Sequence, residues 1–277
     1  MLRQPPPHGT YAPGWGTRGL LWLSQNTPLG RGKARRLMAA WVRRLNADKL
    51  DTELFGQKVR LHMQNNSSEV KALMKPAQYS RAEFAFCRQH LPVNGGVFVD
   101  IGANAGLFSL GAAQHMQSGT LIAFEPQPVL FARLKANLAD LNPALINRLS
   151  VHLFQAAVGA VPGDMSLSVP DQLGQASARH LEGAEQISVP VQTLSNALEN
   201  VEILNIDLLK VDVEGFEDEV LLPFIENADQ RVWPKAIVLE HCHRDRWGRD
   251  CEQVLVELGY EVVHKDRTNL MLTWQGR

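Results

Sequence analysis

"VFVDIGANAGLFSL", residues 97–110, is the stretch from which the fold is best predicted. A short apolar run ends at Asp100, and Gly102, Asn104 and Gly106 follow before a second apolar run begins. A strand that turns into a helix through small residues is typical of the ligand-binding edge of a doubly wound α/β sheet. Glycines there let the backbone adopt positive φ and approach a ligand closely. The pattern predicts such a sheet, with a small-molecule site at this turn.

The rest of the chain continues the alternation of strand and helix. Alternating elements predict a doubly wound, mostly parallel sheet, and a C-terminal hairpin adds an antiparallel edge strand. An irregular stretch, residues 159–194, is expected to hold two short strands around a polar loop, and residues 163–186 of it to shape an acceptor pocket. The predicted strands are 97–101, 119–126, 149–158, 207–215 and 235–241, the hairpin is 260–274, and the helices lie in 105–116, 128–142, 216–229 and 245–258.

The N-terminal part differs from the rest in charge. Residues 1–49 carry nine Lys/Arg and one acidic residue, a net +8, whereas the whole chain has a net charge of −1. Prolines and glycines predict an irregular arm over residues 1–30. An amphipathic helix follows, and it either packs on the main domain or lies on a membrane surface. Its apolar stripe is Leu37, Met38, Trp41, Val42 and Leu45.

Length and composition predict one α/β domain with an N-terminal extension. The 277 residues are 45% apolar and 21% charged, which is ordinary for a globular protein. We expect residues 1–49 to form the basic arm and helix, 50–96 a strand and helix lead-in, and 97–277 the ligand-binding domain. Three scattered cysteines and the lack of a long apolar run predict a cytoplasmic protein without disulfides.

The glycine turn distinguishes two classes of cofactor. Counted from Gly102, Asn104 and Leu107 occupy the second and third glycine positions of a dinucleotide fingerprint, and their side chains would crowd a pyrophosphate. D-x-G-x-N-x-G instead fits S-adenosylmethionine, which has no pyrophosphate. Asp100 would attract its ammonium group directly or through water. Gly102 and Gly106 would leave room for its amino-acid part, and Asn104 would add a hydrogen bond.

An acidic residue completes the predicted cofactor site. Glu125 ends the next strand nineteen residues after Gly106, close to the spacing at which a carboxylate accepts ribose hydroxyls in such sheets. We expect Pro126, Ala157 and Asp212 to line the same cofactor site.

Three motifs resemble the FkbM family of S-adenosylmethionine-dependent methyltransferases. They are "FVDIGANAGLFSL" (98–110), "AFEPQP" (123–128) and "LLKVDVEGFEDEVL" (208–221), within a similarity that spans about residues 79–240. The resemblance implies a class I methyltransferase fold, which is Rossmann-like. For the better-known members it implies O-methylation of sugar or polyketide hydroxyls. The sequence departs from the family at Ser195, where relatives usually have an aspartate.

The third motif supplies the candidate catalytic residues. Lys210, Asp212 and Glu214 are spaced by two at a strand end, so we expect their side chains to point the same way. Asp212 and Glu214 are candidates for the general base that takes a proton from an acceptor hydroxyl. Glu217 falls in the first turn of the next helix, where its charge suits the helix dipole.

A second group of candidates ends the fifth strand. Glu240 and His241 are expected to contact the acceptor at the mouth of the pocket. Strand alternation would place His241 and His243 together on the opposite face from Glu240. Two histidines are a weak ligand set, so no metal site is predicted.

The sequence therefore predicts an O-methyltransferase. The expected acceptor is a hydroxyl on a sugar, glycolipid or secondary metabolite, either as a small molecule or linked to a glycan or lipid. The alternatives are an N-methyltransferase and a non-catalytic Rossmann-like binding module. Nucleic acid is disfavoured as an acceptor, because no N/D-P-P-Y/F motif is present. The basic arm is a candidate for peripheral contact with the inner face of a membrane.

Overall fold

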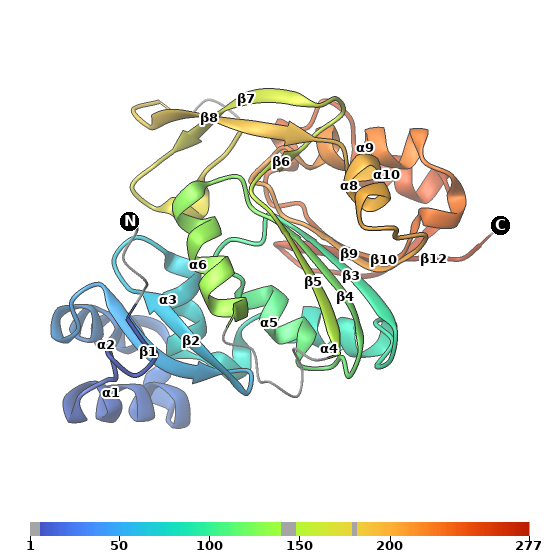
Figure 1. The fold of residues 1–277 in the computed structure, drawn as a ribbon. Coiled ribbons are helices and arrows are strands. Elements are labelled where there is room, and N and C mark those ends of the chain that lie inside the picture. The colour runs from blue at the N-terminus through green and yellow to red at the C-terminus, as the bar shows by residue number, and fades with distance from the viewer. Residues whose placement is uncertain (1–5, 140–147, 179–181, 277) are drawn as a thin grey trace.

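A seven-stranded sheet forms the centre of the computed structural model, which describes residues 6–139, 148–178 and 182–276 (Figure 1). Strands β3, β4, β5, β9 and β10 run parallel, and β12 pairs antiparallel with both β10 and β11. The predicted mostly parallel sheet with an antiparallel edge is confirmed. Its strands, in spatial order, are β11 (Tyr260–Lys265), β12 (Asn269–Trp274), β10 (Pro234–Glu240), β9 (Ile206–Val211), β3 (Gly96–Ile101), β4 (Gly119–Phe124) and β5 (Leu149–Phe154).

Helices cover both faces of this sheet. Strands β3 and β9 are buried along their whole length, as expected for parallel strands between two layers of helices. Successive side chains of β3 pack into cores on opposite faces of the sheet. Phe98 packs with residues of α4, α5 and α6, and Val99 packs with residues of α8, α9 and α10. The helices are α4 (Arg81–His90), α5 (Leu107–Ala113), α6 (Pro128–Ala139), α8 (Leu194–Asn200), α9 (Glu217–Asn227) and α10 (Cys251–Glu257).

These elements confirm most of the predicted alternation, with two corrections. The strand predicted over residues 207–215 ends at Val211, so Asp212 and Glu214 lie in the turn after β9 and strand alternation does not set their directions. Residues 149–158 were expected to form one strand, but they form β5 and a separate β6 (Ala157–Val158). Strand β4 ends at Phe124, which pairs with Phe154, so the chain beyond Phe154 has no partner in the main sheet. The helix predicted over residues 128–142 is described as far as Ala139, and the rest of the predicted range lies outside the described residues.

A small second sheet lies at the upper edge of the molecule in Figure 1. Strand β6 pairs parallel with β8 (Glu185–Gln192), which pairs antiparallel with β7 (Gly163–Val169). Leu167 and Val189 are buried between the strands and form the centre of its own small core. The two strands predicted within residues 159–194 are thus confirmed, although they are long rather than short.

The N-terminal part packs on one face of the body (Figure 1). The prediction of an irregular arm is wrong for residues 15–26, which form a helix. Pro13 and Pro28 flank this helix and do not interrupt it. Ser24 is fully buried and donates a 2.8 Å hydrogen bond to the carbonyl of Met74. The elements are α1 (Trp15–Asn26), η1 (Pro28–Gly30), α2 (Gly32–Leu45), β1 (Lys49–Leu54), β2 (Gln57–His62), α3 (Ser67–Met74) and η2 (Pro76–Gln78).

The apolar stripe predicted for residues 32–45 divides into two groups. Met38 and Val42 are buried against the body, whereas Leu37, Trp41 and Leu45 are exposed. The stripe is therefore only partly a packing surface. Among the described residues, no helix combines the length and the apolar character needed to cross a membrane.

Candidate active site

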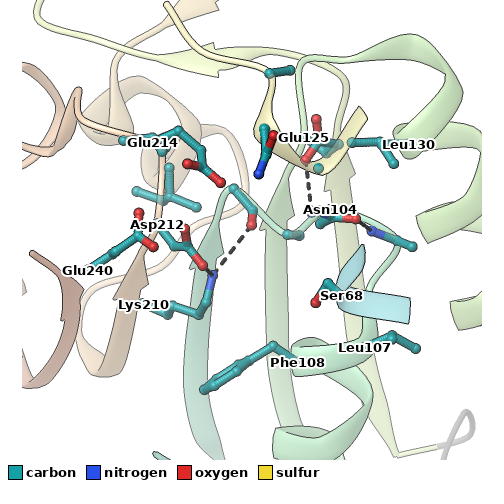
Figure 2. A pocket seen from close by; sticks show the side chains of 18 of the residues that line it. Ser68, Asn104, Leu107, Phe108, Glu125, Leu130, Lys210, Asp212, Glu214 and Glu240 are labelled. Carbon is teal, nitrogen blue, oxygen red and sulfur yellow. Dashed lines mark hydrogen bonds and ion pairs between the residues drawn. The ribbon is translucent and has the colours of Figure 1, made fainter. Parts of the chain in front are cut away.

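A cavity of about 710 Å³ opens where β3, β4, β9 and β10 end (Figure 2). Its size is typical of a small-molecule site. Residues of β7 and of the following segment close one side, as expected for residues 163–186, and α3, η2 and the start of α4 close another. Eight predicted site residues line the cavity, namely Gly102, Asn104, Glu125, Pro126, Ala157, Asp212, Glu214 and Glu240, whereas Asp100, Gly106 and His241 do not.

The turn after β3 has the conformation that its glycines predict. Gly102 has a φ of +79°, and a Cβ atom there would lie 1.8 Å from the carbonyl oxygen of Asp212. Gly106 has a φ of +84°, and Asn104 also lies in the left-handed region, with a φ of 54°. Gly102 therefore permits the close contact between the β3 and β9 turns that forms the floor of the site.

Asp100 lies beneath this turn and not in the cavity wall. It is fully buried, and its Oδ2 accepts a 2.6 Å hydrogen bond from the Ser109 hydroxyl. Its Oδ1 lies 3.3 Å from the Lys210 amino group. The predicted direct contact with a ligand ammonium would need an exposed carboxylate. In this structure Asp100 is positioned to act on the site through Lys210.

Lys210 links the two turns. Its amino group lies 3.2 Å from Oδ2 of Asp212, donates to the carbonyl of Gly102 at 3.4 Å and lies 5.4 Å from the centre of the Phe108 ring. Burial alone would lower the pKa of Lys210, but the carboxylates of Asp100 and Asp212 outweigh burial and raise it. Lys210 thus remains charged and holds both carboxylates in place.

Glu125 occupies the position predicted for a ribose-binding residue. The backbone N–H groups of Asn104 and Gln127 donate to its two carboxylate oxygens at 2.8 and 2.9 Å. Burial raises the pKa of Glu125 to about 7, although these two hydrogen bonds oppose the rise. The carboxylate is therefore fixed at the end of β4 and lines the cavity.

Three carboxylate side chains converge at the other side of the cavity, from Asp212, Glu214 and Glu240 (Figure 2). Burial, followed by the charge of Asp212, raises the pKa of Glu214 to about 7. Burial and then the charges of Asp212 and Glu214 raise the pKa of Glu240 to about 10. At neutral pH, Glu240 is therefore a protonated acid, while Glu214 titrates close to pH 7.

Glu214 and Glu217 are held by the turn that follows β9. Glu214 has a φ of 55°, and its carbonyl accepts a 3.0 Å hydrogen bond from the Ser177 hydroxyl. Glu217 accepts hydrogen bonds from the backbone N–H groups of Val213 and Gly215 at 3.0 and 3.1 Å. Glu217 is fully buried and does not line the cavity, which agrees with the structural role predicted for it.

The histidines after β10 are not arranged as predicted. His241 is buried outside the cavity lining, with its Nε2 2.8 Å from the carbonyl oxygen of Asp266. His243 instead lies 3.2 Å from the Glu214 carboxylate. Strand β10 ends at Glu240, so the alternation used for the prediction does not apply beyond it. Among the described residues, the ligand atoms of Glu240, Cys242 and His243 lie within 4.8 Å of one another, so these three side chains could hold a metal ion.

The sequence interpretation missed the wall formed by α3 and η2. Asn66 accepts hydrogen bonds from the first N–H groups of α3 and donates one of 2.6 Å to Oδ1 of Asn104. The Tyr79 hydroxyl lies 3.2 Å from Oγ of Ser68, and burial raises its pKa to about 12. Asn66 followed by Glu69 is a helix-start pattern. That pattern indicates the helix but not that it borders the ligand site.

The residues around the cavity fit S-adenosylmethionine. Gly102 allows the backbone of the turn after β3 to line the cavity closely. The buried carboxylate of Glu125 lies at the end of the neighbouring strand, β4. The two turns meet where the strand order reverses, which is where ligands bind in doubly wound sheets. The sheet order and this site define a class I methyltransferase that uses S-adenosylmethionine.

The chain belongs to the FkbM methyltransferase family. A family model described as the methyltransferase FkbM domain matches residues 100–262. "Methyltransferase sdnD" from Sordaria araneosa is 31% identical over 209 residues, which are 64% of this chain and 78% of that protein. "31-O-demethyl-FK506 methyltransferase FkbM" from Streptomyces tacrolimicus is 30% identical over 172 residues, 51% of this chain and 62% of that protein.

A solved structure of a methyltransferase from Geobacter sulfurreducens is 16% identical, with a TM-score of 0.42. The alignment covers 72% of this chain and 79% of that chain. The class assignment rests on the sheet order and the family match and does not depend on this likeness. Ser195, where the sequence departs from its relatives, lies in the first turn of α8 and does not line the cavity.

Replacing Glu125 by glutamine is expected to weaken binding of S-adenosylhomocysteine by roughly 10- to 100-fold. The carboxamide cannot accept from both backbone N–H groups and from the ribose, and hydrogen bonds to charged groups contribute about 1.5–3 kcal/mol. Calorimetric titration measures the loss. Glu199→Gln, an exposed change on α8, is the matched control. If both variants bind S-adenosylhomocysteine with equal affinity, Glu125 does not contribute to cofactor binding.

Proposed function

We propose that the protein transfers the methyl group of S-adenosylmethionine to a hydroxyl oxygen. The acceptor class that we propose is a sugar, glycolipid or secondary metabolite, free or linked to a glycan or lipid. The principal support is the position of Glu214, a carboxylate that lines the cavity and has a pKa of about 7. One relative is named as a methyltransferase of 31-O-demethyl-FK506, a name that implies an oxygen acceptor.

Glu214 suits a general base because a base is most effective when its pKa lies near the working pH. The cofactor supplies an electrophilic methyl group, and the acceptor oxygen must lose its proton as the new C–O bond forms. In our proposal Glu214 takes this proton. Glu240, protonated at neutral pH, would donate a hydrogen bond to the acceptor, and Asp212 would stay paired with Lys210.

An amine acceptor is less compatible with this arrangement. An amine must be unprotonated to attack the methyl group, whereas neighbouring carboxylates favour its charged form. Asp212, Glu214 and Glu240 all line the cavity. This cluster supports O-methylation over N-methylation, which is the alternative reaction.

The proposal is tested with S-adenosylmethionine labelled in its methyl group and with pairs of acceptors that differ only in a hydroxyl or amino group. Mass spectrometry and NMR of the product identify the methylated atom. We expect transfer to oxygen, with kcat rising roughly tenfold per pH unit below about pH 7 and then levelling, because the base acts only when deprotonated. Transfer to nitrogen alone would contradict O-methylation, and tight cofactor binding without transfer to any acceptor would favour a binding module.

We also propose a cytoplasmic location for the protein. The support is that Cys87, Cys242 and Cys251 are all free thiols, as expected in a reducing compartment.

A further inference from the structure

The helices α1 and α2 and the short helix η1 between them expose six large apolar side chains, together called here the N-terminal apolar surface. All three of the strongly exposed tryptophans among the described residues belong to it. The other large apolar side chains that are exposed are valines and leucines of the body. The exposed fractions are 88% for Trp15, 60% for Trp22, 53% for Leu29, 64% for Leu37, 54% for Trp41 and 54% for Leu45.

Packing within this protein does not account for these side chains. Helix α1 is attached to the body by its other face, where Thr17, Leu21 and Ser24 are buried. Helix α2 is attached by Met38 and Val42. Both helices are therefore fixed without the exposed tryptophans and leucines, and they lie next to each other at one end of the molecule (Figure 1).

The charged side chains within this segment are all basic. Residues 6–47 contain no aspartate or glutamate. The guanidinium of Arg18 lies 5.8 Å from the Trp15 ring centre, and that of Arg44 lies 5.9 Å from the Trp41 ring centre. A partner must offer apolar contact and negative charge together. The exposed basic side chains on the two helices and the turn between them are Arg18, Arg31, Lys33, Arg36 and Arg44.

We propose that the N-terminal apolar surface docks the protein on an anionic lipid bilayer. Tryptophan is favoured at the level of the lipid head groups, and arginine and lysine are attracted to anionic lipids. An amphipathic helix with a basic polar face is typical of peripheral membrane binding. A second copy of the chain would bring two basic surfaces together, and their repulsion disfavours self-association through this face.

Helix α2 borders the ligand cavity, and η1 contacts a residue that lines it. Arg35 of α2 and Lys75, which follows α3, both line it. The backbone of Gly30 in η1 packs against the Lys75 side chain, because a Cβ atom on Gly30 would lie 2.4 Å from Cε of Lys75. Docking would therefore bring the cavity close to the bilayer, where a lipid-linked acceptor would be presented. This consequence for the acceptor rests on the proposed function, whereas the docking itself does not.

Co-sedimentation of the full chain with vesicles tests the proposal. We expect binding to phosphatidylcholine vesicles that contain about 30% phosphatidylglycerol to be roughly tenfold or more stronger than binding to phosphatidylcholine alone, and to weaken at high salt. Substituting glutamine for Trp15, Trp22 and Trp41 together should reduce binding by roughly tenfold. The control variant Val161→Gln with Leu204→Gln removes two exposed apolar side chains elsewhere and should bind as the unaltered chain does.

Failure of the unaltered chain to bind anionic vesicles would overturn the docking proposal, as would equal loss of binding in both variants. Self-association that the tryptophan substitutions abolish, measured by sedimentation velocity, would also overturn it by assigning the surface to a second copy. Titration with S-adenosylhomocysteine is carried out on each variant. Its result bears on the methyltransferase site alone, so the two proposals fail independently.

Discussion

Replacing Lys210 by methionine is expected to lower the free energy of unfolding by about 3–5 kcal/mol. The substitution leaves the carboxylate of Asp100 fully buried and removes the Lys210 amino group that lies 3.3 Å from it, and it frees Asp212 from the same cation. Removing one partner of a buried ion pair is costly because the remaining charge loses both water and its counter-charge. Urea unfolding followed by circular dichroism measures the change.

A second substitution separates this effect from simple loss of packing. The double variant Asp100→Asn with Lys210→Met should recover most of the lost stability, since no buried charge remains and Ser109 can still donate to the amide oxygen. Lys265→Met, which removes a lysine paired with Glu252 near the surface, is the control and should cost less than about 1 kcal/mol. A double variant no more stable than Lys210→Met would contradict the role given to the Asp100–Lys210 pair.

Replacing Glu214 by glutamine is expected to reduce kcat by roughly 10²- to 10³-fold while the affinity for S-adenosylhomocysteine changes little. A general base contributes about this much to rate, and the amide cannot accept the proton. The rise of kcat through about pH 7 should disappear in the variant, because the group that titrates there has been removed.

The pH dependence of kcat distinguishes a base from a residue that only shapes the turn. Glu214 adopts a φ of 55°, so a substitution there can also disturb the backbone. A variant that loses rate but keeps the original pH profile would show that Glu214 is structural. Glu261→Gln, an exposed change on β11, should leave both kcat and its pH profile as they are.

The alternation of strands and helices along the chain could be predicted because its signals are local. Asp100, Gly102 and Gly106 are close in sequence and specify one turn, and Glu125 follows at the spacing set by one helix and one strand. Glu217 was also correctly placed in the first turn of α9. Each of these predictions depends on one turn or on the next helix and strand along the chain.

Features that depend on contacts between distant segments could not be predicted. The burial of Asp100 depends on Lys210 from another strand, and the cavity wall at Tyr79 depends on how η2 folds over the sheet. The position of His241 was missed because a periodic pattern does not reveal where β10 ends. Proline and glycine content suggested an irregular start, but α1 lies between the prolines.

The titration of the purified full chain with S-adenosylhomocysteine, beside NAD, is the most direct test of the central claim that the turn after β3 binds S-adenosylmethionine. We expect one molecule of S-adenosylhomocysteine to bind per chain with a Kd of roughly micromolar order, which corresponds to about −8 kcal/mol. NAD should not bind, because Asn104 and Leu107 stand where a pyrophosphate needs glycines. Binding of NAD, or a folded chain that binds neither ligand, would contradict the claim.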